Sequence, residues 1–332
     1  MTVELAALTE LEPALRADGF FERDDLVARV YVGYRATAPS APDPCRLPAV
    51  AYSYEEPPSS DGAYEIGDWS ATWSERDYVR AIETVRGAIF EGDVYQVNLV
   101  QHLCAQFDGD ASALAAALAH LRPLEPAPFA GDGWTIVSAS PELLLSRRGS
   151  RLRTEPIKGT RPAGVPVDSP KDAAEHVMIV DLERNDLARV AKPGSVRWPQ
   201  LLHERELAGV THLVATVEAE QRDDVSLTEL LEAMLPGGSV TGCPKLAALE
   251  LIAALEPVGR GAAMGALGRI YPNGDLDLAL TIRTFAVVDG AIHLWVGGGI
   301  VWDSEPQAEV EESWVKARPL LAALGARAAV PA

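Results

Sequence analysis

The segment RTEPIKGTRP places one lysine where a predicted strand gives way to a turn. Lys158 is followed by Gly159 and Thr160, so its neighbours in the chain are small. A lysine amine becomes a nucleophile when burial and nearby cations lower its pKa, and a carboxylate beside it can accept its proton. The residue types alone leave a second interpretation open, in which Lys158 is an ordinary solvated loop lysine.

A second group of residues combines open backbone with carboxylates. The run GGGIV at 297–301 precedes a predicted helix that carries Glu309, Glu312 and Lys316. Residues three or four apart share one helix face, and paired carboxylates suit Mg²⁺, which prefers oxygen ligands. Glu175, on another predicted helix, can join the same ion. The alternative is a salt-bridged, solvated helix face.

A glycine-rich turn, LPGGSVTGCPK at 235–245, leads into another predicted helix. Its first and last turn glycines have phosphate-loop spacing, but Cys-Pro follows where Lys-Ser/Thr is required. Free N–H groups at a helix start still favour an anion such as a carboxylate. A tightly packed helix cap explains the same residues equally well.

Two single residues are further candidates. Arg283 lies within the apolar run LTIRTF, and a buried arginine needs an anion, which is either a substrate carboxylate or a structural acid. His212 in VTHLVAT is either a core histidine or an acid-base group. The chain contains no HExxH, GxSxG or strand-linked GxGxxG motif.

Composition narrows the class of partner. The chain has 332 residues, with 29 Lys and Arg against 48 Asp and Glu, which gives a net charge of −19. The electrostatic field of this negative net charge repels polyanions, so we expect no nucleic-acid or anionic-membrane partner. Three separated cysteines favour a reducing cytoplasm, and neither a signal peptide nor a run long enough to span a bilayer is evident.

The pattern of elements predicts an α+β fold with large mixed sheets, because strands outnumber simple β-α-β units. A Pro- and Ser-rich loop region over 36–74 is the expected boundary before the first long helix, which Ser74 caps and Gly92 ends. The expected helices cover 75–91, 111–121, a long stretch from Pro170, a stretch opened by Pro244, and 305–323. The expected strands include 94–103, 134–140, a hairpin over Gly149-Ser150, 265–271, 277–290 and 291–302.

Taken together and in order, nine motifs resemble the chorismate-utilising enzymes, the family of anthranilate synthase component I. They are GDVYQVNLVQ, SPELLL, PIKGTRP, AEHVMIVDLERNDL, VTHLVAT, PGGSVTGCPK, LTIRT, GGGIVWDS and AEVEESWVKA. The resemblance implies a four-layer α/β/β/α sandwich of two large, mainly antiparallel sheets. It also implies a shortened N-terminal region over 1–74, a chorismate-binding catalytic core over 75–323 and a C-terminal tail over 324–332.

Two positions discriminate within this family. Members that add water resemble one another in having a lysine base where this chain has Gln96, so isochorismate and salicylate synthesis are not expected. Among members that add ammonia, anthranilate synthases have alanine where this chain has Lys158, and aminodeoxychorismate synthases have lysine. The resemblance therefore implies amination of chorismate to 4-amino-4-deoxychorismate through a covalent lysine adduct, for p-aminobenzoate and folate synthesis.

The resemblance also assigns roles to the remaining candidates. Glu142 of SPELLL corresponds to a general acid-base, and His212 to a pocket histidine. Mg²⁺ is the expected cofactor, and chorismate is the expected dicarboxylate substrate. The expected metal ligands are Glu175, Glu309 and Glu312, and the expected substrate-binding residues are Gln96, Gly159, Thr160, Arg283, Gly298, Gly299 and Lys316.

Ammonia is expected from a separate glutamine amidotransferase subunit, because no glutaminase signature is present. Ala163, Ala263 and Arg269 depart from the residues that the family usually has, which puts the identity of the substrate in question. Two alternatives stay open: anthranilate synthesis or another chorismate amination of specialised metabolism, and a catalytically silent chorismate-binding subunit.

Overall fold

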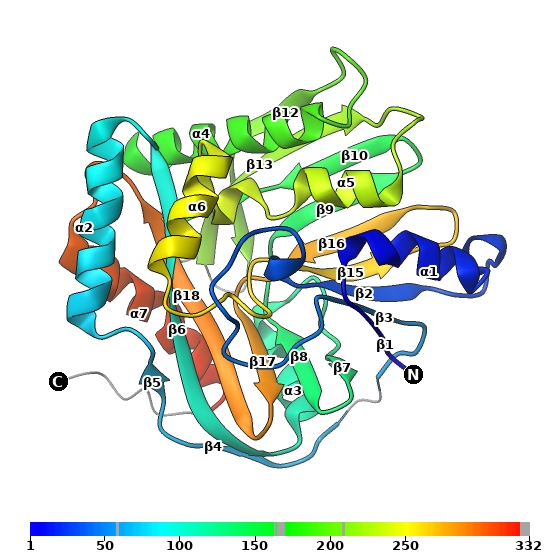
Figure 1. The fold of residues 1–332 in the computed structure, drawn as a ribbon, viewed down its shortest axis with the longest axis horizontal. Helices are drawn as coiled ribbons and strands as arrows, with labels where there is room; N and C mark the ends of the chain where they lie inside the picture. Colours follow the sequence, from blue (N-terminus) through cyan, green and yellow to red (C-terminus); the bar gives the residue numbers. More distant parts are fainter. Residues whose placement is uncertain (58–59, 163, 165–169, 208–209, 326–332) are drawn as a thin grey trace.

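Two antiparallel sheets lie face to face at the centre of the protein, and helices cover their outer faces (Figure 1). The computed structural model describes residues 1–57, 60–162, 164, 170–207 and 210–325. The expected four-layer α+β architecture is confirmed. The sheets are simpler than expected, since every strand pairing within these ranges is antiparallel.

Sheet 1 carries the lysine strand near one edge. Its order is β1 (Val3–Leu5), β3 (Val50–Ser53), β2 (Ala28–Val32), β15 (Ala266–Ile270), β16 (Leu276–Leu280), β9 (Leu143–Arg148), β10 (Arg151–Glu155), β13 (Val210–Glu220) and β11 (Ile157–Pro162). A further strand, β12 (Arg197–Leu207), also pairs with β13.

Sheet 2 carries the glycine-rich strand. Its order is β14 (Gly242–Cys243), β6 (Gln96–Gly109), β18 (Ala291–Ile300), β17 (Thr284–Val288), β8 (Trp134–Ser138) and β7 (Phe129–Gly131). Two short strands, β4 (Tyr64–Ile66) and β5 (Ser70–Ala71), pair with β6.

The helices pack on the two outer faces and beside the edge of sheet 2. They are α1 (Leu11–Ala17), α2 (Glu75–Glu91), α3 (Leu114–Leu118), α4 (Pro170–Ala188), α5 (Leu227–Met234), α6 (Lys245–Leu255) and α7 (Pro306–Ala323). The α4 helix packs on β11, β12 and β13, whereas α7 packs on β18 and α2 packs on both β6 and α7 (Figure 1). None of the described helices is long and apolar enough to cross a bilayer.

Alternation along the strands of sheet 2 divides the core in two. On β6, Leu99 and Leu103 belong to the cluster under α2, α3 and α7, whereas Val100 belongs to the cluster shared with sheet 1. Successive strand residues point to opposite faces, so the two buried faces of one strand contribute to different clusters. That burial keeps β6 and β18 in a fixed register beneath the site.

Helix ends follow the local sequence. The Ser74 side chain accepts a hydrogen bond from the Asp77 N–H at the start of α2, and Gly92 ends the helix in the left-handed region with φ of 85°. The helices expected from Pro170, after Pro244 and over 305–323 are confirmed, as is the hairpin over Gly149-Ser150.

The expected strand over 277–290 is wrong as a single element. It is divided between β16 of sheet 1 and β17 of sheet 2, and Arg283 lies in the break with φ of 51°. The chain crosses from one sheet to the other here, and the Arg283 carbonyl accepts a hydrogen bond of 3.0 Å from the Ala139 N–H. The apolar run is continuous because both strands are buried, so periodicity could not reveal the break.

The expected helix over 111–121 is also shorter than predicted. Only α3 is α-helical, and 3-10 turns at Ala111–Ala113 and Ala119–Leu121 flank it. The alanines favour a helix, but buried Leu114 and Leu118 anchor only its central turn. Residues 1–74, expected as a shortened N-terminal region packed on the core, contribute β1, β2 and β3 to sheet 1 and β4 and β5 to sheet 2.

Candidate active site

Lys158 lies on β11 next to a break in strand register. It pairs with Leu213 of β13, and the register shifts between Lys158 and Thr160, where Gly159 takes φ of 58°. Glycine adopts this left-handed conformation without the steric cost that other residues bear. The break turns Lys158 away from a regular ladder, and its Nζ donates a hydrogen bond of 3.3 Å to the Ser239 carbonyl.

The surroundings of Lys158 favour its neutral amine. Burial lowers the pKa of Lys158, and the Lys316 cation lowers it further, whereas Glu142, Glu175 and Glu312 oppose these effects. A lysine with a depressed pKa has more of the free amine that attacks an electrophile. The same electrostatic contacts show that residues from α4, from α7 and from the segment just before β9 converge on this lysine.

Glu142 is the second buried group, with 4% of its surface exposed. Its carboxylate accepts a hydrogen bond of 2.6 Å from the Ser239 hydroxyl. Burial raises the pKa of Glu142 to about 7, although Ser239, Lys158 and Arg283 favour its charged form. A carboxyl with this pKa exchanges a proton readily at neutral pH, which suits a general acid-base.

Ser239 therefore contacts both reactive groups, and a 3-10 turn at Gly238–Val240 presents it. The turn is tight on its α4 side, because a Cβ at Gly238 would lie 2.9 Å from the Cβ of Leu182. The Ser239 N–H is donated to Glu183 Oε1 at 3.3 Å. Only glycine at 238 lets the turn approach the helix this closely.

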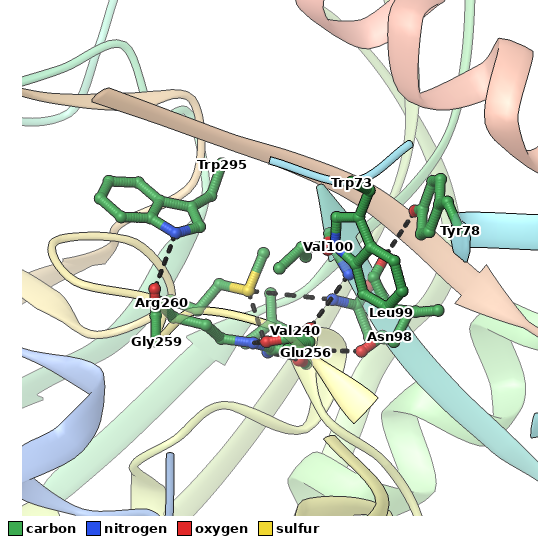
Figure 2. Close-up of polar contacts among 11 residues, drawn as sticks. Trp73, Tyr78, Asn98, Leu99, Val100, Val240, Glu256, Gly259, Arg260 and Trp295 are labelled. Atoms are coloured by element: carbon green, nitrogen blue, oxygen red, sulfur yellow. Dashed lines mark hydrogen bonds and ion pairs between the residues drawn. The ribbon is translucent and has the colours of Figure 1, made fainter. Parts of the chain in front are cut away.

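A fully buried arginine holds the other side of this turn (Figure 2). Arg260 donates to the Val240 carbonyl at 2.7 Å and to the Asn98 carbonyl of β6 at 2.8 Å. Its charge is balanced by Glu256, whose two oxygens accept hydrogen bonds of 2.8 and 2.9 Å. Arg260 thus ties the turn that presents Ser239 to the strand that carries Gln96.

A second group of residues surrounds Gly298 on β18. A Cβ there would lie 3.4 Å from Glu309 Oε2 and from Lys316 Nζ, and 3.5 Å from Glu312 Oε1, so three α7 side chains meet at one glycine. Lys316 Nζ forms an ion pair of 2.8 Å with Glu312 and donates to the Gly297 carbonyl. Glu309 accepts a hydrogen bond of 2.6 Å from Ser304.

The carboxylates fit the chemistry of a hard cation. Glu309 and Glu312 present oxygens to the same glycine, and Glu175 of α4 is near enough to influence the pKa of Lys158. Oxygen donors of this kind suit Mg²⁺. Among the described residues, no group of three or more His, Cys, Asp or Glu side chains already stands in a metal-binding arrangement.

Gln96, at the start of β6, lies close to Gly299 of β18. Gln96 pairs with Cys243 of β14 and is 1% exposed, and neither polar atom of its amide has a hydrogen-bond partner within the described part of the chain. A Cβ at Gly299 would overlap that amide. A buried amide without partners costs about 1–3 kcal/mol, so this position suits hydrogen bonding to a small polar molecule.

Arg283 and His212 complete the set. Burial lowers the pKa of Arg283, and the nearby Glu142 carboxylate opposes this. His212 on β13 lies opposite Thr160, and burial followed by the charges of Arg283 and Arg205 lowers its pKa to about 4. His212 is therefore neutral at pH 7. The Thr160 side chain and Ala163 lie outside the described residues.

The other departures noted in the sequence lie at different places. Ala263 is buried at 1% exposure, whereas Arg269 on β15 pairs with Glu56 and Glu125 rather than with the site. Sequence reasoning missed the contacts of Ser239, Glu183 and Arg260. Ser239 stood within the glycine-rich turn, and Glu183 stood among the polar residues of α4, but no local pattern joins them.

Comparison with known proteins identifies the family of the chain. The family model for chorismate binding enzymes matches residues 16–322. The chain is 39% identical over 268 residues to aminodeoxychorismate synthase component 1 of Klebsiella aerogenes, covering 76% of this chain and 59% of that protein. It is 40% identical over 271 residues to anthranilate synthase component 1 of Thermus thermophilus, covering 77% of this chain and 58% of that protein. The chain thus spans about three fifths of the length of these curated relatives.

Solved structures of chorismate enzymes share the fold of this chain. Anthranilate synthase component I from Streptococcus pneumoniae superposes with a TM-score of 0.81 at 25% identity, covering 91% of this chain and 84% of that chain. The menaquinone-specific isochorismate synthase from Escherichia coli superposes with a TM-score of 0.76 at 20% identity, covering 97% of this chain and 84% of that chain, and shows the shared fold. The chain that places Lys158, Glu142 and the α7 carboxylates together belongs to the family of chorismate binding enzymes.

Proposed function

We propose that this chain aminates chorismate to 4-amino-4-deoxychorismate, as the synthase subunit of an aminodeoxychorismate synthase. The observation that carries the proposal is Lys158, whose lowered pKa and hydrogen bond to Ser239 suit a nucleophile. Family resemblance places alanine at this position in anthranilate synthases. Relatives of both kinds are about equally similar to this chain, so the residue and not the degree of identity supports the choice.

The proposed reaction has two balanced displacements. The neutral Lys158 amine attacks C2 of the chorismate ring while the C4 hydroxyl departs, and protonated Glu142 supplies the proton that turns this hydroxyl into water. Glu142 regains a proton from the adduct nitrogen. Ammonia then attacks C4 while Glu142 returns its proton to the departing nitrogen, so that the bond from C2 to Lys158 breaks and the lysine leaves as a neutral amine. The ammonium group formed at C4 then loses its extra proton to the Glu142 carboxylate. The pKa of Glu142, about 7, suits both directions of transfer.

The charges around the site suit a dicarboxylate. Glu175, Glu309 and Glu312 would hold Mg²⁺, which when bound supplies a positive charge that neutralises a substrate carboxylate. Arg283 and Lys316 provide the side-chain cations for the rest of the substrate, with the open backbone of Gly298 and Gly299 beside them. Without these cations, the carboxylates of the site would repel the substrate.

Gln96 supports ammonia over water as the incoming group. Its amide cannot remove a proton, whereas activation of water needs a base, and ammonia is already a nucleophile. Curated relatives are named as component 1 of their enzymes. We therefore infer that a separate glutamine amidotransferase subunit supplies ammonia, and that free ammonium replaces it in vitro.

Mass spectrometry of the product tests this function. The purified chain is incubated with chorismate, magnesium chloride and ammonium chloride, and we expect 4-amino-4-deoxychorismate, which an added lyase converts to p-aminobenzoate. Anthranilate fluorescence would instead identify an anthranilate synthase. Chorismate binding without turnover at saturating ammonium would identify a silent subunit and overturn the proposal.

The lysine variant tests the covalent route. Lys158→Ala should lose turnover by roughly 10³-fold or more, as removal of a nucleophile typically does, and should lose any chorismate adduct in the mass of the intact protein. Lys192→Ala is the matched control, because Lys192 pairs with exposed Asp223 away from the site. Equal turnover in the two variants would contradict a nucleophilic role for Lys158.

A further inference from the structure

Behind the reactive pair lies a third buried acid, on the inner side of α4. Glu183 is 2% exposed, and its Oε1 accepts a hydrogen bond of 3.3 Å from the Ser239 N–H. Its Oε2 is buried without a hydrogen-bond partner within the described ranges. Neither the proposed chemistry nor the proposed metal ligands use this residue.

Ser239 has three different contacts through three different atoms. Its N–H is held by Glu183, its hydroxyl is donated to Glu142, and its carbonyl accepts from Lys158. The position of one residue therefore determines the geometry at both reactive groups. The contact with Glu183 is the side-chain contact that fixes Ser239 from the helix side of the turn.

Other contacts anchor the same turn but not Ser239 itself. Lys245 of α6 donates to the Pro236 carbonyl at 2.9 Å and forms an ion pair with Asp186, one turn beyond Glu183 on α4. Arg260 holds the Val240 carbonyl on the far side. The glycine at 238 brings the turn within reach of the Glu183 carboxyl.

We propose that Glu183 is a positioning residue that acts through Ser239 on Lys158 and Glu142. Its task is to accept the Ser239 N–H, so that the hydroxyl and the carbonyl of Ser239 point at the two reactive groups. A displacement of reactive groups by about 1 Å can reduce an enzyme's rate 100-fold, so this contact affects turnover more than substrate affinity.

The charge state of Glu183 agrees with this task. Burial, then the neighbouring Asp186 and Glu142 carboxylates, raise the pKa of Glu183 to about 8, while Lys245 opposes them. Its surroundings therefore favour the neutral acid, whose carbonyl oxygen still accepts the N–H. An amide can replace such a group, and an alkyl side chain cannot.

Two substitutions separate the hydrogen bond from the packing. Glu183→Gln keeps an acceptor of the same shape, and Glu183→Leu fills a similar space without an acceptor. We expect turnover within about 3-fold of the parent in Glu183→Gln and a 10- to 100-fold lower kcat in Glu183→Leu, with KM for chorismate changed less than 3-fold.

A second readout does not depend on the product. Competitive acetylation of Lys158 by acetic anhydride over a range of pH, followed by peptide mass spectrometry, reports the pKa of this lysine. The Ser239 carbonyl stabilises the ammonium form of Lys158, so misplacing it should move the labelling curve of Glu183→Leu to lower pH. The curve of Glu183→Gln should match that of the parent.

Glu12→Leu is the matched control. Glu12 is also buried and accepts backbone N–H groups of a distant segment, at Leu227 and Thr228 of α5. This variant should have a lower melting temperature but an unchanged Lys158 labelling curve and kcat. If Glu183→Leu does not fold, Glu183→Ala replaces it in both measurements.

The outcomes are distinguishable from those of the proposed function, on which the activity measurement rests. Failure of the parent to aminate chorismate overturns that function, and the labelling of Lys158 still tests the positioning. Identical labelling curves and kcat values in the parent and Glu183→Leu overturn the positioning role. Equal losses in Glu183→Gln and Glu183→Leu also overturn it, because the acceptor would then not be the property that matters.

Discussion

The hydroxyl of Ser239 donates a hydrogen bond of 2.6 Å to the carboxylate of Glu142, in a region where both residues are at most 4% exposed. Burial alone would favour the protonated acid, whereas the serine favours the carboxylate. The two effects act against each other and leave the pKa of Glu142 at about 7. The serine therefore helps to set the pH range in which the acid can exchange its proton.

Ser239→Ala should move the pH profile of the reaction to higher pH. A hydrogen bond to a charged group contributes about 1.5–3 kcal/mol, which corresponds to a pKa increase of roughly one unit or more for Glu142. Glu142 must be protonated to release the hydroxyl, so kcat/KM falls as the pH rises above the pKa of Glu142. In Ser239→Ala this fall should occur at a higher pH. Ser195→Ala, on a turn away from the site, should keep the parent profile. A profile that does not move would contradict the role of this hydrogen bond.

Gly299→Ala and Gly298→Ala should differ in severity. A methyl group at Gly299 overlaps the buried Gln96 amide, whereas one at Gly298 meets only the ends of flexible α7 side chains at 3.4 Å or more. Overpacking of this kind costs about 1–3 kcal/mol, so kcat/KM of Gly299→Ala should fall roughly 10-fold or more. Gly298→Ala should lose less. Steady-state kinetics compare them, and the reverse order would show that Gln96 is not held as described.

The sequence allows the candidate reactive groups to be named, whereas it does not reveal the residues that support them. Lys158, the α7 carboxylates and the glycine run could be named because their types and spacing are local. Ser239 meets Glu183 and Glu142 across 56 and 97 residues of chain, and no periodicity reports such a contact. Arg283 was expected within one strand, but the break between β16 and β17 lies inside a continuous apolar run.

Turnover should require a divalent cation, and Glu312→Gln should lower the affinity of the protein for that cation. The substitution removes one anionic oxygen from the group around Gly298 and keeps the size of the side chain. We expect EDTA to abolish turnover, Mg²⁺ to restore it, and Glu312→Gln to need a higher Mg²⁺ concentration. Glu311→Gln, on the same helix but paired with Arg318, is the control. Full activity in EDTA would rule out a metal-dependent site.

Glu256→Gln should destabilise the protein more than the loss of an exposed ion pair does. Arg260 is fully buried, and Glu256 is its only carboxylate partner within the described residues (Figure 2). Removing one partner of a buried pair leaves an uncompensated charge and typically costs about 3–5 kcal/mol. Urea unfolding measures this loss, and Arg318→Gln, in an exposed pair, should have a much smaller effect. Similar losses of unfolding free energy in both variants would show that the buried Arg260–Glu256 ion pair is not important for stability.

His102 and His293 should make folding sensitive to mild acid. Their rings stack, a distance of 3.0 Å joins His102 Nε2 to His293 Nδ1, and burial lowers their pKa values to about 3 and about 4. In the unfolded chain these histidines bind protons below about pH 6.5, whereas in the folded protein they stay neutral until the pH is much lower. The folded state therefore has its full stability above about pH 6.5 and loses part of it as the pH falls toward 4. Each histidine contributes up to about 1.4 kcal/mol per pH unit to this loss. The free energy of unfolding in urea between pH 7.5 and 5.5 should fall less steeply in His293→Gln than in the parent, and the exposed His120→Gln should match the parent. An unchanged slope in His293→Gln would show that the pair does not control acid stability.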